Sequence, residues 1–140
     1  MKQILLFLFV GLLFITVKCQ TSQTDCKIKI TEPKDMDSVK WQPIVRGNIT
    51  GNFKEVWVIV HPMANGLQNR WVQPKVSFKN DTTWQVQIYI AEQGSQYIGE
   101  HFEIKAFVDP QVTLSDGKVL NEWPKAKCSS DIIEVIRKGK

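Results

Sequence analysis

The sequence has 140 residues, with 18 Lys and Arg against 14 Asp and Glu and a formal net charge of +4. That length suits one domain with one hydrophobic core. The charges are interspersed except for a basic run at residues 137–140. Because nucleic-acid binding requires a concentrated basic face, we expect no nucleic-acid partner.

Residues 1–19 have the layout of a secretory signal peptide. Lys2 supplies a positive charge, an apolar stretch follows at residues 4–17, and the sequence then turns polar at once. As a helix this stretch spans about 21 Å, which is shorter than the roughly 30 Å hydrocarbon core of a bilayer. We therefore predict a cleaved signal helix at residues 1–19 that directs the protein out of the cytoplasm.

The end of this signal allows more than one interpretation of Cys19. Val17 and Cys19 suit the −3 and −1 positions of a cleavage site, which would give a secreted chain, extracellular or periplasmic, that begins at Gln20. Alternatively, Cys19 is the lipidated first residue of a bacterial-type lipoprotein held on the outside of a membrane. That signal has a small residue where this chain has Lys18. An uncleaved anchor is the third interpretation, and we expect membrane contact only if Cys19 is lipidated.

Export decides how the three cysteines are interpreted, because thiols outside the cytoplasm tend to pair. Cys26 opens the first expected strand and Cys128 precedes the last. We predict a disulfide between them, which would close a loop of about 100 residues and stabilise the fold by roughly 4–5 kcal/mol. The predicted domain covers residues 26–138, after a short tether at residues 20–25. Metal binding by the cysteines is not expected, because no pair has C-x-x-C spacing.

Apolar and polar residues alternate with period two along most of the remaining sequence. The pattern is clearest at residues 83–90, where Trp84, Val86, Ile88 and Ile90 share one face. Turn-forming clusters separate such segments, and no long stretch has helical periodicity. We predict a single all-β domain, an antiparallel β-sandwich of about seven or eight strands. The expected strands cover residues 27–30, 43–49, 56–60, 68–74, 76–78, 83–90, 101–109 and 131–137.

Several short motifs resemble those of immunoglobulin-like modules in bacterial secreted and surface proteins. Residues 30–33 read I-T-E-P and residues 45–51 read V-R-G-N-I-T-G, similar to the first strand end and the second strand of such modules. Residues 56–58, 81–84 and 102–106 resemble their third strand, hairpin and F-x-I-x-A strand. The resemblance covers nearly the whole mature chain and implies an Ig-like or fibronectin-III-like sandwich. It implies no activity, because such a fold is a scaffold for its loops.

Two positions depart from the pattern of that family. Met36 or Asp37 stands where the first turn usually has Gly, and Thr82 replaces the Gly of the hairpin. Both departures fall in turns, and the alternation of the strands is unaffected. The implied fold therefore stays the same.

The sequence lacks the motifs of the common catalytic classes. Its two histidines are His61 and His101, and it contains no nucleophile-elbow serine, no H-E-x-x-H and no Gly-rich phosphate loop. Asp35 and Asp37 begin an acidic loop, but Lys40 stands where an EF-hand needs its turn glycine. We expect no enzyme activity, no cofactor and no bound metal.

The five tryptophans are the strongest candidates for a binding function. Trp57 and Trp84 lie in apolar strands, where we expect core packing. Trp71 follows a turn and has amide and Arg donors as neighbours, an arrangement typical of a sugar or peptide platform. We predict a ligand-binding patch, and ordinary loop anchoring is the alternative. The patch consists of His61, Arg70, Trp71 and Gln73.

Two N-glycosylation sequons begin at Asn48 and Asn80, both close to predicted turns. In a eukaryotic protein Asn80 is the better glycan site, because it lies at an expected hairpin tip. In a bacterial protein both are chance matches.

These observations lead to a secreted or surface-attached, non-catalytic binding or adhesion module, which we expect to be a monomer. Its expected partner is a glycan or a protein that contacts the loop aromatics. One alternative is an accessory domain of a larger envelope assembly that docks through an exposed sheet edge. The other is a small secreted hydrolase, which the missing catalytic motifs disfavour.

Overall fold

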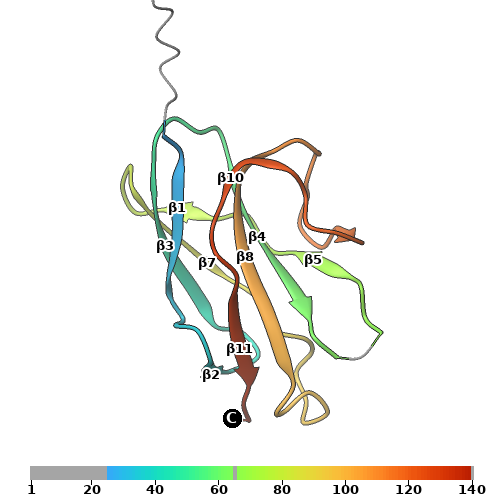
Figure 1. Ribbon diagram of the computed structural model, residues 1–140. Helices are drawn as coiled ribbons and strands as arrows, with labels where there is room; N and C mark the ends of the chain where they lie inside the picture. The colour runs from blue at the N-terminus through green and yellow to red at the C-terminus, as the bar shows by residue number, and fades with distance from the viewer. Residues whose placement is uncertain (1–24, 65, 140) are drawn as a thin grey trace, which may run out of the picture.

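The computed structural model describes residues 25–64 and 66–139, and within them the protein is all-β, with eleven strands in two sheets (Figure 1). The all-β class and the mostly antiparallel pairing predicted from the alternation are confirmed. No described segment forms a helix that is long and apolar enough to cross a membrane. The predicted signal peptide, Cys19 and most of the tether lie outside the described residues.

The smaller sheet has four strands, all antiparallel to their neighbours. In chain order they are β1 (Lys27–Glu32), β3 (Ile44–Thr50), β6 (Ser77–Phe78) and β7 (Thr83–Gln87). They lie side by side in the order β1-β3-β7-β6. Every second side chain of β3 is buried, as expected of a strand with one face on a core.

The predicted strand at residues 83–90 is shorter than expected, because its ladder ends at Gln87. The chain nevertheless stays extended beyond that point. The backbone N–H groups of Ile88 and Ile90 donate to the carbonyls of Pro43 and Trp41, at 3.0 and 2.8 Å. Both isoleucine side chains are buried, as the alternation predicted.

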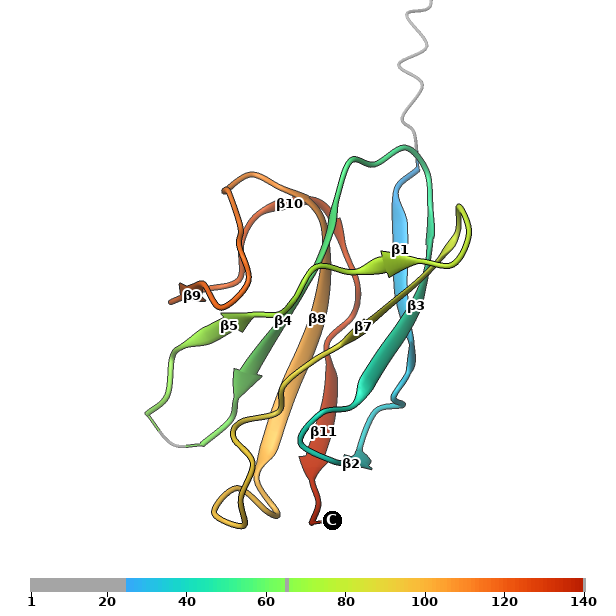
Figure 2. The same ribbon diagram turned by 180° about the vertical axis from the view of Figure 1, so that it is seen from behind.

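The larger sheet follows the order β2-β11-β8-β4-β5-β9, and β10 adds to β8. All its pairs are antiparallel except β2 with β11. Figure 2 shows β5 and β9 beside β4 at one side of this sheet. In chain order its members are β2 (Asp37–Val39), β4 (Val56–Pro62), β5 (Arg70–Val72), β8 (His101–Pro110), β9 (Val119–Leu120), β10 (Ala126–Ser129) and β11 (Ile133–Arg137).

The main core lies between the two sheets, as in a β-sandwich. The smaller sheet contributes Ile28, Val45 and Trp84, and the larger sheet contributes Val58 and Ile104 among others. Trp84 has no exposed surface, which confirms its predicted place in the core. Burial of these apolar side chains is the main force that holds the sheets together.

A second apolar cluster covers the outer face of the larger sheet. It contains Trp57, Ile59, Val72, Phe107 and Leu114, with Trp123 packed against it. Leu114 and Trp123 come from the connection between β8 and β10, which folds back over the sheet. This cover explains why β4 is buried on both faces, and it accounts for the burial of Trp57.

The predicted disulfide between Cys26 and Cys128 is present, with Cα atoms 5.9 Å apart. Cys26 immediately precedes β1, and Cys128 lies in β10 of the larger sheet. The bond therefore joins the two sheets at the end of the molecule where the described chain begins (Figure 1).

The departure from the family pattern in the first turn falls on Met36. Its backbone has φ of 66°, the left-handed conformation that glycine adopts most easily. Asp37 is instead the first residue of β2, and its Oδ2 accepts a 2.7 Å hydrogen bond from the Lys34 N–H. The turn thus keeps a glycine-type geometry without a glycine.

Candidate functional site

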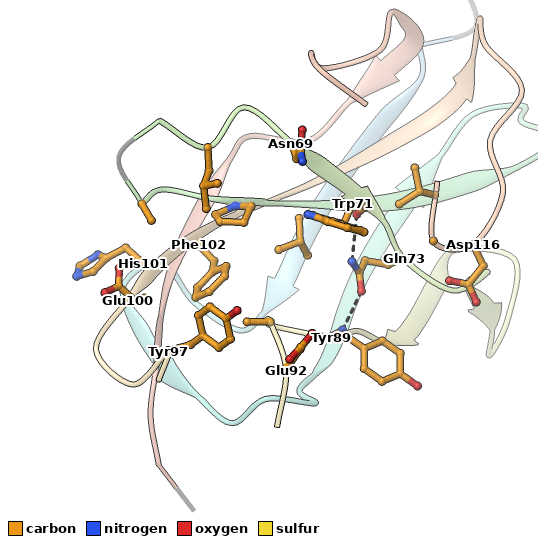
Figure 3. A pocket seen from close by; sticks show the side chains of 17 residues that line it. Asn69, Trp71, Gln73, Tyr89, Glu92, Tyr97, Glu100, His101, Phe102 and Asp116 are labelled. Carbon is orange, nitrogen blue, oxygen red and sulfur yellow. Dashed lines mark hydrogen bonds between the residues drawn. The ribbon is translucent and has the colours of Figure 1, made fainter. Parts of the chain in front are cut away.

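A pocket of about 380 Å³ lies between β5 and the connection from β7 to β8 (Figure 3). Its lining includes the end of β4 and the start of β8, which lie away from the start of β1 (Figure 1). That volume is within the range of small-ligand sites. The end of β4 and the start of β8 form its floor with Val60, Pro62 and Phe102. The Cys26–Cys128 disulfide lies at the opposite end of the molecule.

Aromatic side chains form much of the pocket wall. Trp71 and Tyr89 remain 44% and 45% exposed, and Tyr97 and Phe102 also line the pocket. The Tyr89 ring points away from Tyr97 and Phe102 (Figure 3) and lies 6.0 Å from the ring of Trp41. The Cα of Trp71 pairs with that of Val60, so its ring is on the inner side of the larger sheet. Large, half-exposed aromatic side chains are characteristic of binding surfaces.

Gln73 connects the two walls of the pocket. Its Nε2 donates to the Trp71 carbonyl at 3.0 Å, and its Oε1 accepts from the Tyr89 N–H at 2.8 Å (Figure 3). The side chain is only 3% exposed, so both hydrogen bonds are shielded from water. Gln73 is therefore a positioning residue that sets the spacing between Trp71 and Tyr89.

The remaining polar lining is acidic. Glu92 and Glu100 come from the connection between β7 and β8, and Asp116 comes from the turn before β9. Two backbone bonds hold that turn on β5: Gly117 N–H donates to the Val72 carbonyl at 3.0 Å, and Val72 N–H donates to the Lys118 carbonyl at 2.9 Å. No Lys or Arg is among the described residues that line the pocket.

A strained backbone position lies in the pocket wall. Ala91 has φ of 60°, which an L-residue with a side chain rarely adopts, and it directly precedes Glu92. The unusual conformation follows Ile90, whose N–H is bonded to the Trp41 carbonyl. Such positions occur often at functional sites, where the surrounding structure holds the strain.

The structure does not bring the four predicted patch residues together. Trp71 and Gln73 line the pocket, but His61 and Arg70 lie on the other face of the larger sheet. The reason is strand alternation: Arg70 and Trp71 are consecutive in β5, so their side chains point in opposite directions. Two of the four predicted patch residues, Trp71 and Gln73, therefore line the pocket, and the other two, His61 and Arg70, belong to a separate contact.

His61 and Arg70 hold the connection between β8 and β10 on the sheet. The Arg70 Nη1 donates to the carbonyls of Gln68 and Asn121, at 2.8 and 2.7 Å, and its guanidinium lies 4.8 Å from the centre of the Trp123 ring. His61 meets the same ring edge-on, with its Nδ1 2.8 Å from Glu103 Oε2. These contacts match the alternative of loop anchoring.

The sequence reasoning missed Tyr89, Tyr97 and the three carboxylates of the pocket. Tyr89 was detectable, because the alternation at residues 83–90 already placed it on the outward face. Tyr97, Glu92 and Glu100 lie in a connection without periodicity, and only the folded structure brings them to β5.

Asp35 and Asp37, which had been considered as calcium ligands, both accept backbone hydrogen bonds, from Glu134 N–H and Lys34 N–H. No group of three or more His, Cys, Asp or Glu side chains among residues 25–64 and 66–139 is arranged to hold a metal ion.

The two sequons differ in structure. Asn80 lies in the turn before β7, where its Oδ1 accepts from Thr82 N–H, the Thr82 hydroxyl and Thr83 N–H. All three bonds use the oxygen, so a glycan on Nδ2 would leave the turn intact. Asn48 is an exposed residue of the central part of β3, paired with Lys29 and Thr83.

The chain matches no model in a scan of protein families, and a search of curated proteins also gives no match.

Proposed function

We propose that the protein is a secreted or surface-attached, non-catalytic binding module with an immunoglobulin-like sandwich as its scaffold. The observation that carries the proposal is the pocket, which half-exposed Trp71 lines together with Tyr97 and Phe102, and half-exposed Tyr89 is also among its lining residues. The two packed, mostly antiparallel sheets and the disulfide suit such a module outside the cytoplasm.

The position of the pocket also supports this proposal. The described chain begins at Asp25, at one end of the sandwich, and the end of β4 and the start of β8, which line the pocket, lie at the other end (Figure 1). A module exported by its amino-terminal segment, and held there if Cys19 is lipidated, would present the pocket away from the point of attachment.

The alternative of docking through a sheet edge has less support. The edge strands β2, β6 and β9 have three, two and two residues, too few for an extended partner strand. Two further strands have a free edge. β10 pairs with β8 alone and has four residues, and β1 carries Lys27 and Lys29 on its exposed face, where charged residues oppose pairing with another strand.

Binding to arrays of glycans and peptides tests the proposal. We expect the native protein to bind at least one class of ligand and Trp71→Ala to weaken that binding about tenfold or more, as truncation of a central aromatic anchor does. Ile132→Ala is the matched control, because Ile132 is also an exposed apolar residue but does not line the pocket.

Thermal unfolding of both variants must first show that the fold is intact. Binding that survives Trp71→Ala unchanged would contradict the assignment to this pocket. No binding to either array would contradict the binding function itself.

A further inference from the structure

We infer that the pocket recognises an organic cation, an alkylammonium group of a free amine or of a lysine side chain. This inference rests on the proposed binding function and names the ligand class for the same pocket. It follows from three properties of the lining: its aromatic walls, its unpaired carboxylates and its lack of a competing positive charge.

The aromatic walls suit a cation. Trp71, Tyr97 and Phe102 come from β5, the connection from β7 to β8, and β8, and they line one space. The ring of Tyr89, also a lining residue, points away from these three (Figure 3) and packs 6.0 Å from the ring of Trp41. The faces of aromatic rings carry negative electrostatic potential, and several rings around one pocket attract ammonium groups more strongly when water is excluded. The same walls would also accept the methylene groups of an alkyl chain.

The carboxylates of the pocket have no partner within the protein. Glu32, Glu103 and Glu134 each pair with a cationic or imidazole side chain, and the partner of Glu134 is His101 of the pocket lining. In contrast, no ion pair or side-chain hydrogen bond within residues 25–64 and 66–139 involves the carboxylates of the three acidic lining residues, which are Glu92, Glu100 and Asp116.

Two basic or imidazole groups that are close in sequence to these carboxylates have partners of their own. Lys118 follows the Asp116 turn, but its Nζ donates to the Thr113 carbonyl at 2.5 Å. His101, the one titratable base of the described lining, pairs through Nδ1 with Glu134 on the adjacent strand. The lining therefore carries a net negative charge, from three exposed carboxylates at separate places around the pocket (Figure 3), and this charge favours a cation and opposes an anion.

Neutral sugars would use only part of this lining. They stack on aromatic rings and donate hydroxyl groups to carboxylates, but they leave the charge of three carboxylates uncompensated. An alkylammonium ion supplies N–H donors and the opposite charge together. Charge complementarity thus favours the amine over the neutral ligand.

NMR titration of the full mature protein tests the inference, with n-butylammonium as the charged probe and n-butanol as its neutral counterpart. Nα-acetyl-lysine methylamide and its Nε-acetylated form are the second pair, so that binding to a free amine and to a peptide side chain can be distinguished. We expect both ammonium probes to shift the indole resonance of Trp71, with affinity at least about tenfold above that of the neutral partners.

The variants Glu92→Gln and Glu92→Gln/Glu100→Gln/Asp116→Asn should weaken binding of the ammonium probes stepwise, and added salt should weaken it in the native protein. Glu122→Gln is the matched control, because Glu122 is an exposed acid outside the pocket. It should bind as the native protein does.

Equal affinity for charged and neutral probes, or binding that is indifferent to the three carboxylate substitutions, would overturn the cation inference. If a neutral ligand from the arrays still required Trp71 for binding, the proposed binding function would stand and only the cation inference would be overturned. If no probe and no array ligand bound at Trp71, both would be refuted.

Discussion

At the scale of single residues, Trp84 packs closely against Gly47 in the core. A Cβ on Gly47 would lie 2.2 Å from Cζ2 of Trp84 and 2.3 Å from the Lys29 carbonyl oxygen. Gly47 pairs with Trp84 across β3 and β7, so the indole packs directly over its backbone. The absence of a side chain at position 47 is what admits the largest residue of the core.

We predict that Gly47→Ala lowers the free energy of unfolding by about 3 kcal/mol, since the added methyl overlaps both a buried ring and a strand carbonyl. Urea unfolding followed by tryptophan fluorescence measures this loss. Gly139→Ala is the control, because its Cβ would meet Ile98 at an ordinary 3.5 Å. An unchanged urea midpoint for Gly47→Ala would show that the core has more room than the structure indicates.

Residue spacing also explains how much of the site was predictable. Trp71 and Gln73 are two positions apart, so they share a face, and both of these predicted patch residues line the pocket. Arg70 was grouped with them because it is adjacent in sequence, although period-two alternation sends it to the opposite face. The carboxylates of the pocket carry no local signal, because long-range packing alone brings residues 92, 100 and 116 together.

At the scale of elements, the turn between β1 and β2 holds a side chain where the backbone favours glycine. Met36 has φ of 66° and its side chain is half exposed, so little packing compensates for the strain. Its N–H donates to the Glu134 carbonyl at 2.7 Å, which attaches the turn to β11. The backbone bond, and not the side chain, holds this conformation.

Replacement of Met36 by Gly should therefore stabilise the protein, by about 0.5–1 kcal/mol, because the relief of left-handed strain exceeds the added entropy of the unfolded chain. Met36→Ala separates the two causes, since it removes the exposed side chain but keeps the strain, and we expect it to leave stability nearly unchanged. Differential scanning calorimetry of the three proteins decides the matter. A melting temperature that is lower for the Gly variant than for the Ala variant would refute this account of the turn.

The strands show where sequence patterns succeed and where they stop. Long alternating segments such as residues 101–109 and 43–49 became β8 and β3 with nearly the expected bounds. The short strands β2, β9 and β10 were not expected, because two to four residues are too few to show a period. They exist because longer neighbours offer them a free edge to pair with.

At the scale of the whole molecule, the Cys26–Cys128 disulfide connects the two sheets across a sequence separation of 102 residues. In the chain-entropy model, a closed loop of this length restricts the unfolded chain by roughly 4–5 kcal/mol. That value is a large share of the stability of a domain of this size.

We predict that the double variant Cys26→Ala/Cys128→Ala unfolds at a clearly lower denaturant concentration, with a loss of up to about 4–5 kcal/mol in the free energy of unfolding. Reduction of the native protein should produce a similar loss, and the same reductant should leave the double variant unaffected. Guanidinium titrations with and without reductant measure both effects. Free alkylation of both thiols in the folded, unreduced protein would mean that the bond does not form.

The second apolar cluster is the part of the architecture that the alternation did not reveal. Residues 56–60 are apolar at every position, which indicates that both faces of the strand are buried. The sequence does not show which segment covers the outer face. The answer is the connection from β8 to β10, whose Leu114 and Trp123 have no periodic context. The larger sheet thus has apolar packing on both faces, and the fold is thicker at β4 than two sheets alone would make it.

Gln73 fixes the width of the pocket mouth in the folded protein before a ligand binds. One buried amide joins the carbonyl of Trp71 to the N–H of Tyr89, so the two opposing walls are already ordered relative to each other. The conformational entropy of arranging them is lost during folding and does not reduce the affinity of the ligand. Association of a ligand with such a pocket requires no slow rearrangement of these two residues. The association rate is therefore set by diffusional encounter and not by a conformational change.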